Sequence, residues 1–462
     1  SNPSSLLIRV LCGGPGFSTP WKIRISLHPS VVLFFPFMFW PLPSIRRRGV
    51  RAVSALLLLA FAAPAPARVI EGPDWMVCYN RPGQTGAARL EGEFAIRDLL
   101  IHQLNRLESG HRAALATFTL SGDSFRSGAA APILWAVSSA LDRGVRVHFA
   151  IHRRINRTNE FLPGLSLRRL ADRPANPMEL SVSSGRSLMH HKIGLFDYGE
   201  RDRRVFVGSG NFTGAAAMQQ WNIAVLLRSP TLYGAYAAEL DEFRAGRFGK
   251  AKQRTHDRTG FRLPGSWGNS WVRFAPFADR RDTAETDILP LLDAAEGEIL
   301  FAMHHFNRPP LRRALVAAAN RGLRVAGVIP ESDRGTNRFA ISGATVRYFA
   351  NPNLYTGTNR VHLLPARVNA AGPALDSGQP DLVHLKYALV DPSGPRPLVI
   401  HGAANWTASG LTSPVGNDES ILFLRHAGIA QAFLEQFRCM TGTATSPPSA
   451  PTQPEVSALL SP

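Results

Sequence analysis

The chain carries one stretch of sequence twice, and this internal repeat constrains its fold more than any other feature. Residues 141–147 (LDRGVRV) match residues 319–325 (ANRGLRV). Each copy ends a helical pattern (132–141 or 310–320), places a glycine just past it and starts an apolar strand. Another apolar strand precedes each helical pattern. Because strand, helix and strand in this order form a crossover unit, we predict an α/β fold in both halves, with mainly parallel pairing and helices covering the sheets.

The composition agrees with two folded domains. The 462 residues are 45% hydrophobic and 19% charged, which excludes collagen-like, coiled-coil and wholly disordered chains. We expect an N-terminal arm at 68–83, a first domain at 84–248, a polar linker at 249–270 and a second domain at 271–440. The Ser-, Pro- and Thr-rich tail at 441–462 is expected to be disordered.

Residues 1–67 have the pattern of a leader. Four arginines between 46 and 51 precede an apolar run at 53–63, and the small residues Ala65-Pro66-Ala67 follow. This order predicts a secretory signal peptide cleaved near Ala67, and hence a secreted protein, either extracellular or periplasmic. A membrane anchor is the less favoured alternative, because a spanning helix needs about 20 apolar residues. No Met precedes Met38, so residues 1–45 are expected to reflect an over-extended translation start.

Two cysteines, Cys78 and Cys439, follow the leader. In an oxidising compartment an even pair favours one disulfide, which would tie the N-terminal arm to the C-terminal helix. Two unpaired buried thiols are the alternative, because the sequence does not give the distance between them.

Each half also contains the pattern His-x-Lys-x4-Asp. It reads His190, Lys192, Asp197 in the first half and His384, Lys386, Asp391 in the second. A Gly-x-x-Asn follows in both, ending at Asn211 and Asn405, each 21 residues after its histidine. In a strand, residues i and i+2 share a face, so each imidazole projects beside an ammonium that can hold an anionic oxygen. The two aspartates have the opposite parity and are expected to serve structure at the strand ends.

Ordinary structural roles are the alternatives for these residues. Asn211 and Asn405 precede helical patterns and could be N-caps, and Ser209 could be a turn residue. Isolated His-Lys pairs are usually solvated surface. Because the whole set is duplicated in register with an independent repeat, we favour a functional site.

The double motif resembles that of the phospholipase D superfamily, His-x-Lys-x4-Asp followed by Gly-Ser-x-Asn, over about residues 84–440. The resemblance implies two similar α/β/α sandwich domains related by pseudo-twofold symmetry, with both motifs at one site. It also implies a two-step phosphodiester reaction without a metal or another cofactor. One histidine, here His190, attacks phosphorus to give a phosphohistidine, and His384 serves as acid and base. The phosphate oxygens would be held by Lys192, Lys386, Asn211, Asn405 and Ser209.

Two departures from the family pattern concern the groups that orient the histidines. The family often has a Glu about eleven residues after the motif Asn; the first half has Asn222 there, and the second has Glu419 at fourteen. An amide cannot stabilise an imidazolium as a carboxylate can, so we expect Glu419 to support His384. Asn222 could equally be an ordinary strand residue. Ala403 replaces Ser209 in the second half, which puts the symmetry of the phosphate contacts in doubt.

The charge of the chain says less about its partner. The formal net charge of +18 favours an anionic partner, but all basic residues except five lysines are arginines, which can reflect coding bias. The rare lysines are more informative, since a residue that the composition avoids is more often kept for chemistry. They are Lys22, Lys192, Lys250, Lys252 and Lys386.

We therefore expect an exported, metal-independent phosphodiesterase of the phospholipase D type that hydrolyses phospholipid headgroups, with some transfer to alcohols. A nuclease using the same site is one alternative, because the arginine-rich stretch 143–173 could bind lipid or nucleic acid. A non-catalytic anion-binding protein is the other, disfavoured by the intact His and Lys of both halves. His304 could line the pocket, although a core or loop histidine is more frequent. No cluster has zinc-ligand spacing.

Overall fold

The computed structural model describes most of the chain between residues 69 and 442. The described residues are 6–7, 24–25, 69–80, 95–121, 130–153, 164–183, 187–218, 220–253, 261–263, 267–277, 283–330, 341–366, 382–412 and 416–442. The predicted signal peptide, residues 443–462 of the predicted tail and part of the predicted linker lie outside them. Strands β1 (Leu6–Leu7) and β2 (Arg24–Ile25) pair antiparallel in a compact unit of residues 1–67 and 85–91. The rest of the chain forms a second unit.

The first half of this second unit is built on an eight-stranded sheet. Its order is β3-β4-β11-β9-β8-β5-β6-β7. The strands are β3 (Val69–Gly72), β4 (Trp75–Tyr79), β5 (Arg112–Thr117), β6 (Arg146–Ile151), β7 (Glu179–Val182), β8 (Lys192–Asp197), β9 (Arg203–Gly208) and β11 (Ile223–Arg228). The helices are α3 (Ala95–Asn105), α4 (Ala130–Asp142), α5 (Leu167–Ala171), α6 (Gly214–Met218) and α7 (Pro230–Arg244), and the 3-10 turn η1 (Gly249–Ala251) follows.

The second half repeats this sheet strand for strand, in the order β12-β13-β20-β19-β18-β14-β15-β16. The strands are β12 (Phe261–Arg262), β13 (Trp271–Ala275), β14 (Glu298–Met303), β15 (Arg324–Val328), β16 (Val361–Leu363), β18 (Lys386–Val390), β19 (Leu398–Gly402) and β20 (Glu419–Leu424). The helices are α8 (Ala284–Asp293), α9 (Pro309–Asn320), α10 (Gly343–Ala350), α11 (Ala408–Leu411) and α12 (Ala427–Thr441), with a 3-10 turn η4 (Pro352–Leu354). The predicted α/β fold with two like domains is therefore confirmed.

The local sequence explains the matched helix ends. Gly144 and Gly322, the two glycines of the repeat, follow α4 and α9 with φ of +85° and +94°, the left-handed conformation that ends a helix. Helix α12 ends in the same way at Gly442. Helix α7 has Pro230 in its first turn, and the side chain of Ser229 accepts a hydrogen bond from the N–H of Leu232.

The prediction of mainly parallel pairing is wrong. Only β5, β6 and β7, and the equivalent β14, β15 and β16, pair in parallel; the other neighbours in both sheets are antiparallel. The repeat used for the prediction lies in the crossover from β5 through α4 to β6, which is the parallel part. The motif strands β8 and β9 instead form a hairpin, so the sheets are mixed.

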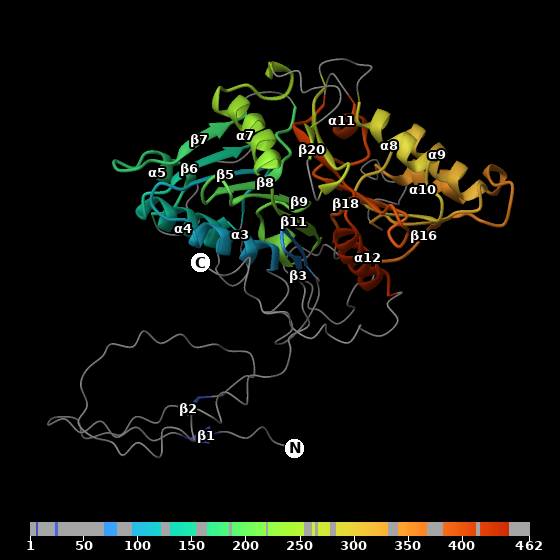
Figure 1. Ribbon diagram of the computed structural model, residues 1–462, viewed down its shortest axis with the longest axis horizontal. Helices are drawn as coiled ribbons and strands as arrows, with labels where there is room; N and C mark the ends of the chain where they lie inside the picture. The colour runs from blue at the N-terminus through green and yellow to red at the C-terminus, as the bar shows by residue number, and fades with distance from the viewer. Residues whose placement is uncertain are drawn as a thin grey trace. The chain divides into compact units, whose positions relative to one another are not determined.

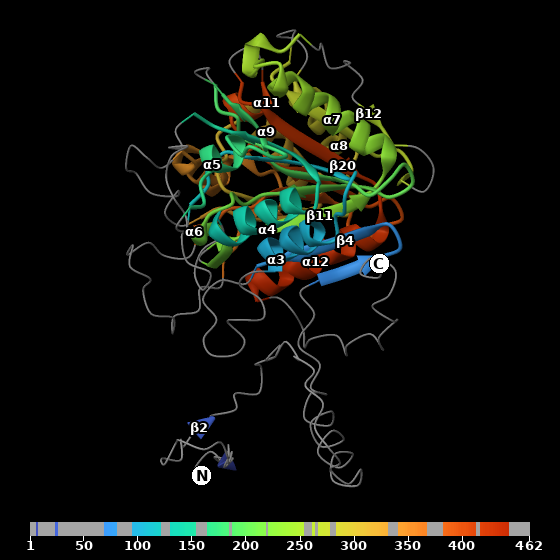
Figure 2. The same ribbon diagram turned by 90° about the vertical axis from the view of Figure 1, so that its left-hand side faces the viewer.

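Helices cover the outer faces of both sheets and also lie between them (Figure 1). Helices α3 and α4 bury the outer face of the first sheet, and α8 and α9 that of the second. A third core joins the inner faces of both sheets and includes residues of α7 and α12. Helix α12 packs on β18 and β19 and also alongside β4 of the first sheet (Figure 2). The shared core makes the two halves one compact body.

The predicted N-terminal arm contributes β3 and β4 to the first sheet. Cys78 of β4 therefore lies away from Cys439. Neither Cys78 nor Cys439 forms a disulfide, so the predicted disulfide is wrong. Side chains alternate along β4: Val77 and Tyr79 face the shared core, whereas Cys78 is buried on the opposite face under α3 and α4. Cys439 packs against the shared core. The sheet therefore separates the two thiols.

Within the described part of the chain, every helix is too short or too polar to cross a bilayer.

Candidate active site

The two motif histidines lie just before the strands that carry the motif lysines. His190 precedes β8, which begins at Lys192, and His384 precedes β18, which begins at Lys386. Both lysine side chains turn back to their own motif: the ammonium of Lys192 donates to the carbonyl oxygen of His190 at 2.6 Å, and that of Lys386 to His384 at 2.7 Å. Both lysines are buried, with 0% and 2% of their surface exposed.

Backbone pairing between the halves brings the two motifs to one site. Met189 bridges in parallel to Asp418, and the N–H of His190 donates to the carbonyl oxygen of Asp418 at 3.0 Å. In the same way β10 (Gln220–Trp221) pairs with β17 (Leu382–Val383), and the N–H of His384 donates to the carbonyl oxygen of Trp221 at 3.0 Å. The segment before each motif histidine is thus hydrogen-bonded to the other half.

This exchange decides which residue orients which histidine. Glu419 follows Asp418, and its carboxylate accepts from Nδ1 of His190 at 2.9 Å, across 229 residues of sequence. The side-chain amide of Asn417 donates to the same carboxylate at 3.1 Å and fixes its position. The expectation that Glu419 supports His384 is therefore wrong: it supports His190. With Nδ1–H donated to a carboxylate, Nε2 of His190 carries the free lone pair.

Asn222 is the structural equivalent of Glu419 and holds His384. Its Oδ1 lies 3.2 Å from Nδ1 of His384, while its amide nitrogen donates to the carbonyl oxygen of Ala216 at 2.9 Å. An amide with its nitrogen turned to a carbonyl offers only an acceptor to His384, so Nδ1 of His384 carries the proton. Asn222 is therefore more than a strand residue. The spacings of eleven and fourteen differ because the second half has a longer stretch between α11 and β20.

Ser209 is not placed as a phosphate ligand. Its hydroxyl is fully buried, donates to Oδ1 of Asn222 at 2.9 Å and accepts from the N–H of Ile223 at 3.1 Å. The single O–H of Ser209 is donated to Asn222 and is not available to a phosphate oxygen. The predicted phosphate contact is therefore wrong, and Ser209 positions Asn222. The second half has Ala403 here and uses Asn417 to hold the equivalent Glu419.

Burial and like charges shift the pKa values of the site. Burial lowers the pKa of His190 well below its ordinary value, and Lys192 and Lys386 lower it further. Burial, Lys386 and His304 do the same for the pKa of His384, and the charge of His190 adds to the effect. Both imidazoles are therefore neutral in the absence of an anion.

The lysines and the carboxylate are shifted in opposite directions. Burial lowers the pKa of Lys192 to about 7 in spite of Glu419, and burial and Lys192 lower that of Lys386. Burial raises the pKa of Glu419 to about 7, with Lys192 opposing the shift. The two lysine side chains are buried and their charges repel each other, so a bound anion would stabilise the site.

The two motif asparagines lie beside the site in different settings. Oδ1 of Asn211 is buried and has no hydrogen-bond partner among the residues that the structure describes. Oδ1 of Asn405 accepts from the N–H of His305 at 3.3 Å, which turns its amide nitrogen away from His305. Neither side chain caps the short helix after it; Thr213 and Thr407 accept from those helices instead. The N-cap alternative is therefore excluded for both.

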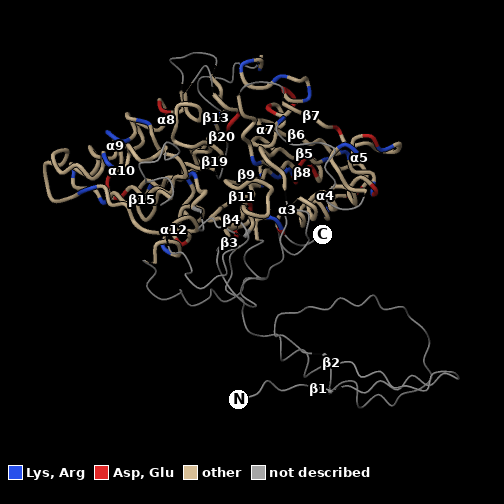
Figure 3. The backbone as a smooth tube through the Cα atoms, turned by 180° about the vertical axis from the view of Figure 1, so that it is seen from behind, with Lys and Arg blue, Asp and Glu red and all other residues tan. Residues whose placement is uncertain are grey.

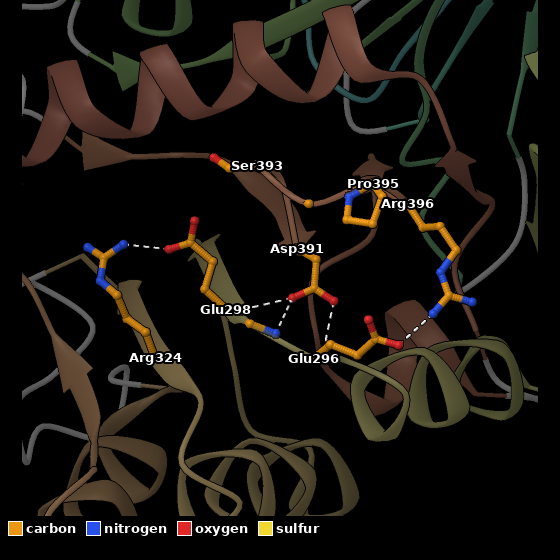
Figure 4. A pocket seen from close by; sticks show the side chains of 9 residues that line it. Glu296, Glu298, Arg324, Asp391, Ser393, Pro395 and Arg396 are labelled. Carbon is orange, nitrogen blue, oxygen red and sulfur yellow. Dashed lines mark hydrogen bonds and ion pairs between the residues drawn. The ribbon is translucent and has the colours of Figure 1, made fainter.

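The two motif aspartates serve structure at the far ends of their strands, as predicted. Asp391 accepts from the backbone N–H groups of Glu296, Gly297 and Glu298 at 2.9, 2.7 and 2.9 Å, and so holds the start of β14 (Figure 4). Asp197 accepts from the N–H of Gly199 at 3.1 Å in the turn after β8. Neither lies near the histidines of its own motif.

Aromatic rings cover the two histidines differently. The ring centre of Phe118 lies 5.3 Å from that of His190, and the ring centre of His304 lies 4.6 Å from that of His384. Phe118 and His304 are equivalent, because each stands two residues before a matched bridge, at Leu120 or Phe306. His304 thus lines the site. Its place after a strand of the parallel crossover was the available sequence signal.

A buried charge network behind His190 was not predicted. Nζ of Lys252 contacts Glu239 of α7 at 2.6 Å and Asp418 at 3.1 Å, and His191 contacts Glu239 at 3.1 Å. Burial lowers the pKa of Lys252, but Glu239 and Asp418 raise it more, and the net value is above the ordinary one. The rarity of lysine in the composition was the signal for this residue.

Charge elsewhere on the chain is mixed. Lys and Arg lie on both halves and are interspersed with Asp and Glu (Figure 3). Among the described residues, no three His, Cys, Asp or Glu side chains gather as metal ligands would.

Comparison with known proteins gives matches at the level of folds and families. No curated protein matches the chain. A solved phosphatidylserine synthase from Haemophilus influenzae Rd KW20 is 12% identical with a TM-score of 0.56, over 75% of this chain and 84% of that one. Polyphosphate kinase from Porphyromonas gingivalis is 14% identical with a TM-score of 0.49, over 79% of this chain, which spans only 50% of that kinase. Nuc from Salmonella typhimurium, a phospholipase D family member, is 20% identical with a TM-score of 0.28, over 38% of this chain and 96% of Nuc.

A family profile matches each half in turn. The profile described as "Cardiolipin synthase, PLD-like domain" covers residues 100–244 and 288–441, and both matches include a complete His-x-Lys-x4-Asp motif. Since the two matches together cover more than half of the chain, it belongs to this phospholipase D-like domain family.

Proposed function

We propose that the chain is a phosphodiesterase that acts on phospholipids through a covalent phosphohistidine at His190, with water or an alcohol as the final acceptor. The observation that carries the proposal is the crossed support of the two histidines. Glu419 of the second half holds His190 at 2.9 Å, and Asn222 of the first half holds His384 at 3.2 Å. Two neutral imidazoles thus lie near the same two lysines, Lys192 and Lys386.

The carboxylate partner favours His190 as the nucleophile. When Nε2 attacks phosphorus, the imidazole becomes positively charged, and a carboxylate on Nδ1–H stabilises that charge as it develops. The P–O bond to the leaving alcohol breaks as the N–P bond forms. An amide oxygen gives His384 less stabilisation, so a protonated His384 gives up its proton readily to the leaving oxygen.

In the second step the two histidines keep their places. His384, now neutral, removes a proton from water or an alcohol, whose oxygen attacks phosphorus and breaks the N–P bond to His190. Lys192 and Lys386, with the amides of Asn211 and Asn405, would hold the non-bridging oxygens. The bound anion raises the pKa of His384 and so loads the acid.

The phospholipid substrate is supported by the family and one solved structure. The matching profile is described as a cardiolipin synthase domain, and the solved structure with a TM-score of 0.56 is a phosphatidylserine synthase. Both of those names refer to phospholipid synthesis, in which an alcohol accepts the phosphatidyl group. We therefore include alcohols as acceptors beside water.

The sharpest test separates the two histidines by trapping the covalent intermediate. A p-nitrophenyl phosphodiester has a leaving group that needs no proton, so His384→Ala should form the phosphoenzyme and accumulate it. His190→Ala should form none. Lys250→Ala, at an exposed lysine outside both motifs, is the matched control and should turn over as the wild type does. A phosphoenzyme in His190→Ala but not in His384→Ala would reverse the two roles.

The substrate class needs a parallel assay. Vesicles of phosphatidylcholine and of phosphatidylglycerol, and single- and double-stranded DNA, are incubated with the wild type and both histidine variants, with and without EDTA. We expect lipid cleavage that EDTA leaves unchanged and that both variants lose. Cleavage of DNA but not of vesicles would show a nuclease with the same chemistry, and binding of either without turnover would show the non-catalytic alternative.

Export is proposed from the leader pattern. If the signal peptide is cleaved, mass spectrometry of the protein recovered from the periplasm or medium should find an N-terminus near Arg68. An unprocessed chain confined to the cytoplasm would contradict it.

A further inference from the structure

An open hollow of about 860 Å³ lies at the end of the second sheet opposite the catalytic histidines. Strand β20 connects the two places, with Glu419 at its first residue and Arg425 just after its last. At about 3.3 Å per residue, they are separated by roughly 20 Å. The residues that matter are Arg262, Asn269, Trp271, Arg396, Arg425 and Ala427.

The hollow is lined by three arginines and, among the residues that the structure describes, by no carboxylate. The guanidinium of Arg425 has no hydrogen-bond or ion-pair partner within the described residues, and Arg262 lies 5.6 Å over the ring of Trp271. Burial and the nearby Arg396 lower the pKa of Arg425. The positive charge of Arg425 is therefore not neutralised by the described residues.

Arg396 has one ion-pair partner among the described residues, and this pair leaves its guanidinium available. It contacts Glu296 at 2.5 Å, with 72% and 66% of the two side chains exposed (Figure 4). Solvent screens an ion pair this exposed, so Arg396 can turn to another anion at little cost.

The internal repeat shows what the first half has at the same positions. Met76 pairs with Leu226 and Trp271 with Phe423, two residues before Arg228 and Arg425. The two arginines are therefore equivalent, and counting back two residues from Met76 and Trp271 makes Asp74 equivalent to Asn269. Glu71, opposite Met76, corresponds to Arg262, opposite Trp271. The spacing from Asp197 to Gly208 equals that from Asp391 to Gly402, so Asp202 corresponds to Arg396.

The charges of the two halves are reversed at this place. In the first half Asp74 neutralises Arg228 at 2.6 Å, and Asp202 neutralises Arg204 at 2.6 Å. In the second half the three acids Glu71, Asp74 and Asp202 are replaced by Arg262, Asn269 and Arg396. The arginine that both halves share is thus paired in one half and surrounded by further arginines in the other.

We propose that this hollow binds a small phosphate-bearing anion, outside the catalytic site and beyond the proposed reaction. Guanidinium groups bind phosphate oxygens in pairs through parallel N–H donors. The first turn of the 15-residue helix α12 begins at Ala427 on the rim and adds the positive end of its dipole. The volume is in the range of small-molecule sites, roughly 300–1,000 Å³, which favours a small ligand over a polymer.

The test measures binding of inorganic phosphate by calorimetry at low ionic strength. The chain carries Lys192→Met and Lys386→Met, so that the catalytic pocket does not contribute. We expect one phosphate per chain, and a loss of affinity of roughly tenfold or more in Arg425→Gln. Asn269→Asp places a carboxylate where Asp74 stands in the first half, and should weaken binding as much while the chain folds normally.

Matched controls locate the effect. Arg228→Gln, the same change in the first half, and the neutral Asn269→Ser should bind phosphate as the parent chain does. If the double lysine variant does not fold, the same comparison in the wild type should show the phosphate stoichiometry fall from two to one. Lipid turnover of Asn269→Asp with both lysines intact should equal the wild type, so a failure of this proposal is distinguishable from a failure of the proposed function.

Two results would overturn the proposal. One is phosphate binding that Arg425→Gln and Asn269→Asp leave unchanged. The other is binding of single-stranded DNA or of phosphatidylglycerol vesicles that depends on Arg425 while inorganic phosphate does not bind at all.

Discussion

Single residues distinguish the two histidines, which the motif alone makes look alike. Nδ1 of His190 is held by a carboxylate and Nδ1 of His384 by an amide. The types of both partners were readable in the sequence, but their assignment was not. Glu419 stands in the half of His384 and reaches His190 only because the halves exchange backbone hydrogen bonds, which is a property of the folded chain.

Replacing Glu419 by glutamine should impair the first chemical step. The amide cannot stabilise the positive charge on a phosphorylated imidazole, so we expect formation of the phosphohistidine to slow by roughly 10²–10⁴-fold. Rapid-quench measurement of the phosphoenzyme with a p-nitrophenyl phosphodiester checks this. Ser209→Ala, which removes a contact to Asn222 on the side of His384, should leave this step nearly unchanged. Equal losses in the two variants would contradict the division of roles.

The shifted pKa values predict a narrow pH optimum. Glu419 must be ionised, and its pKa is raised to about 7, so kcat/KM should fall as the pH drops below that value. Lys192 must be protonated, and its pKa is lowered to about 7, so kcat/KM should also fall above it. A bound phosphate raises the pKa of Lys192, so the alkaline limb of kcat should lie at higher pH than that of kcat/KM.

The pH profile of a variant separates the two limbs. Glu419→Gln should lose the acid limb and keep the alkaline one. A profile that keeps both limbs in this variant would assign the acid limb to another group.

At the level of elements, local sequence predicted what local physics determines. The glycines after α4 and α9, the apolar strands and the duplicated motifs were all found, because each depends on residues a few positions apart. The antiparallel pairing of β8 with β9 was not predicted, because a hairpin and a crossover contain the same apolar strands. The face of the sheet on which Cys78 lies was not predicted either, because it depends on which helices cover each face.

The junction of β19 and β20 gives a prediction at this level. A Cβ added to Gly402 would lie 2.1 Å from the backbone oxygen of Ser420, which is next to Glu419. Gly402→Ala should therefore push the two strands apart, reduce the free energy of unfolding by about 1–3 kcal/mol and lower activity. At the equivalent Gly208, a Cβ would meet side chains and no backbone atom, with the ring of Phe206 at 3.2 Å and Cβ of Ala224 at 3.6 Å, so Gly208→Ala should be milder in urea denaturation and in turnover. A larger effect at Gly208 would contradict this reading of the junction.

The whole molecule depends on contacts that hold the two halves in register. The apolar contacts of the shared core hold the two sheets together but are not directional. The buried charged groups between the halves fix how the two sheets are aligned. Lys252, from the segment after α7, contacts Glu239 of the first half and Asp418 and the carbonyl oxygen of Ala275 of the second. Since the carbonyl oxygen of Asp418 accepts from the N–H of His190, this lysine also helps to set the position of His190.

Lys252→Met should therefore lower both stability and activity. It keeps the volume of the side chain but leaves the carboxylates of Glu239 and Asp418 buried without their cation, which costs about 3–5 kcal/mol in the free energy of unfolding. Urea denaturation measures this cost. Turnover without denaturant, at a temperature well below the thermal unfolding transition, measures the displacement of His190. Lys250→Met, two residues away and exposed, should stay within about 0.5 kcal/mol of the wild type. If Lys252→Met were as stable as Lys250→Met and fully active, the alignment of the halves would rest on the apolar core alone.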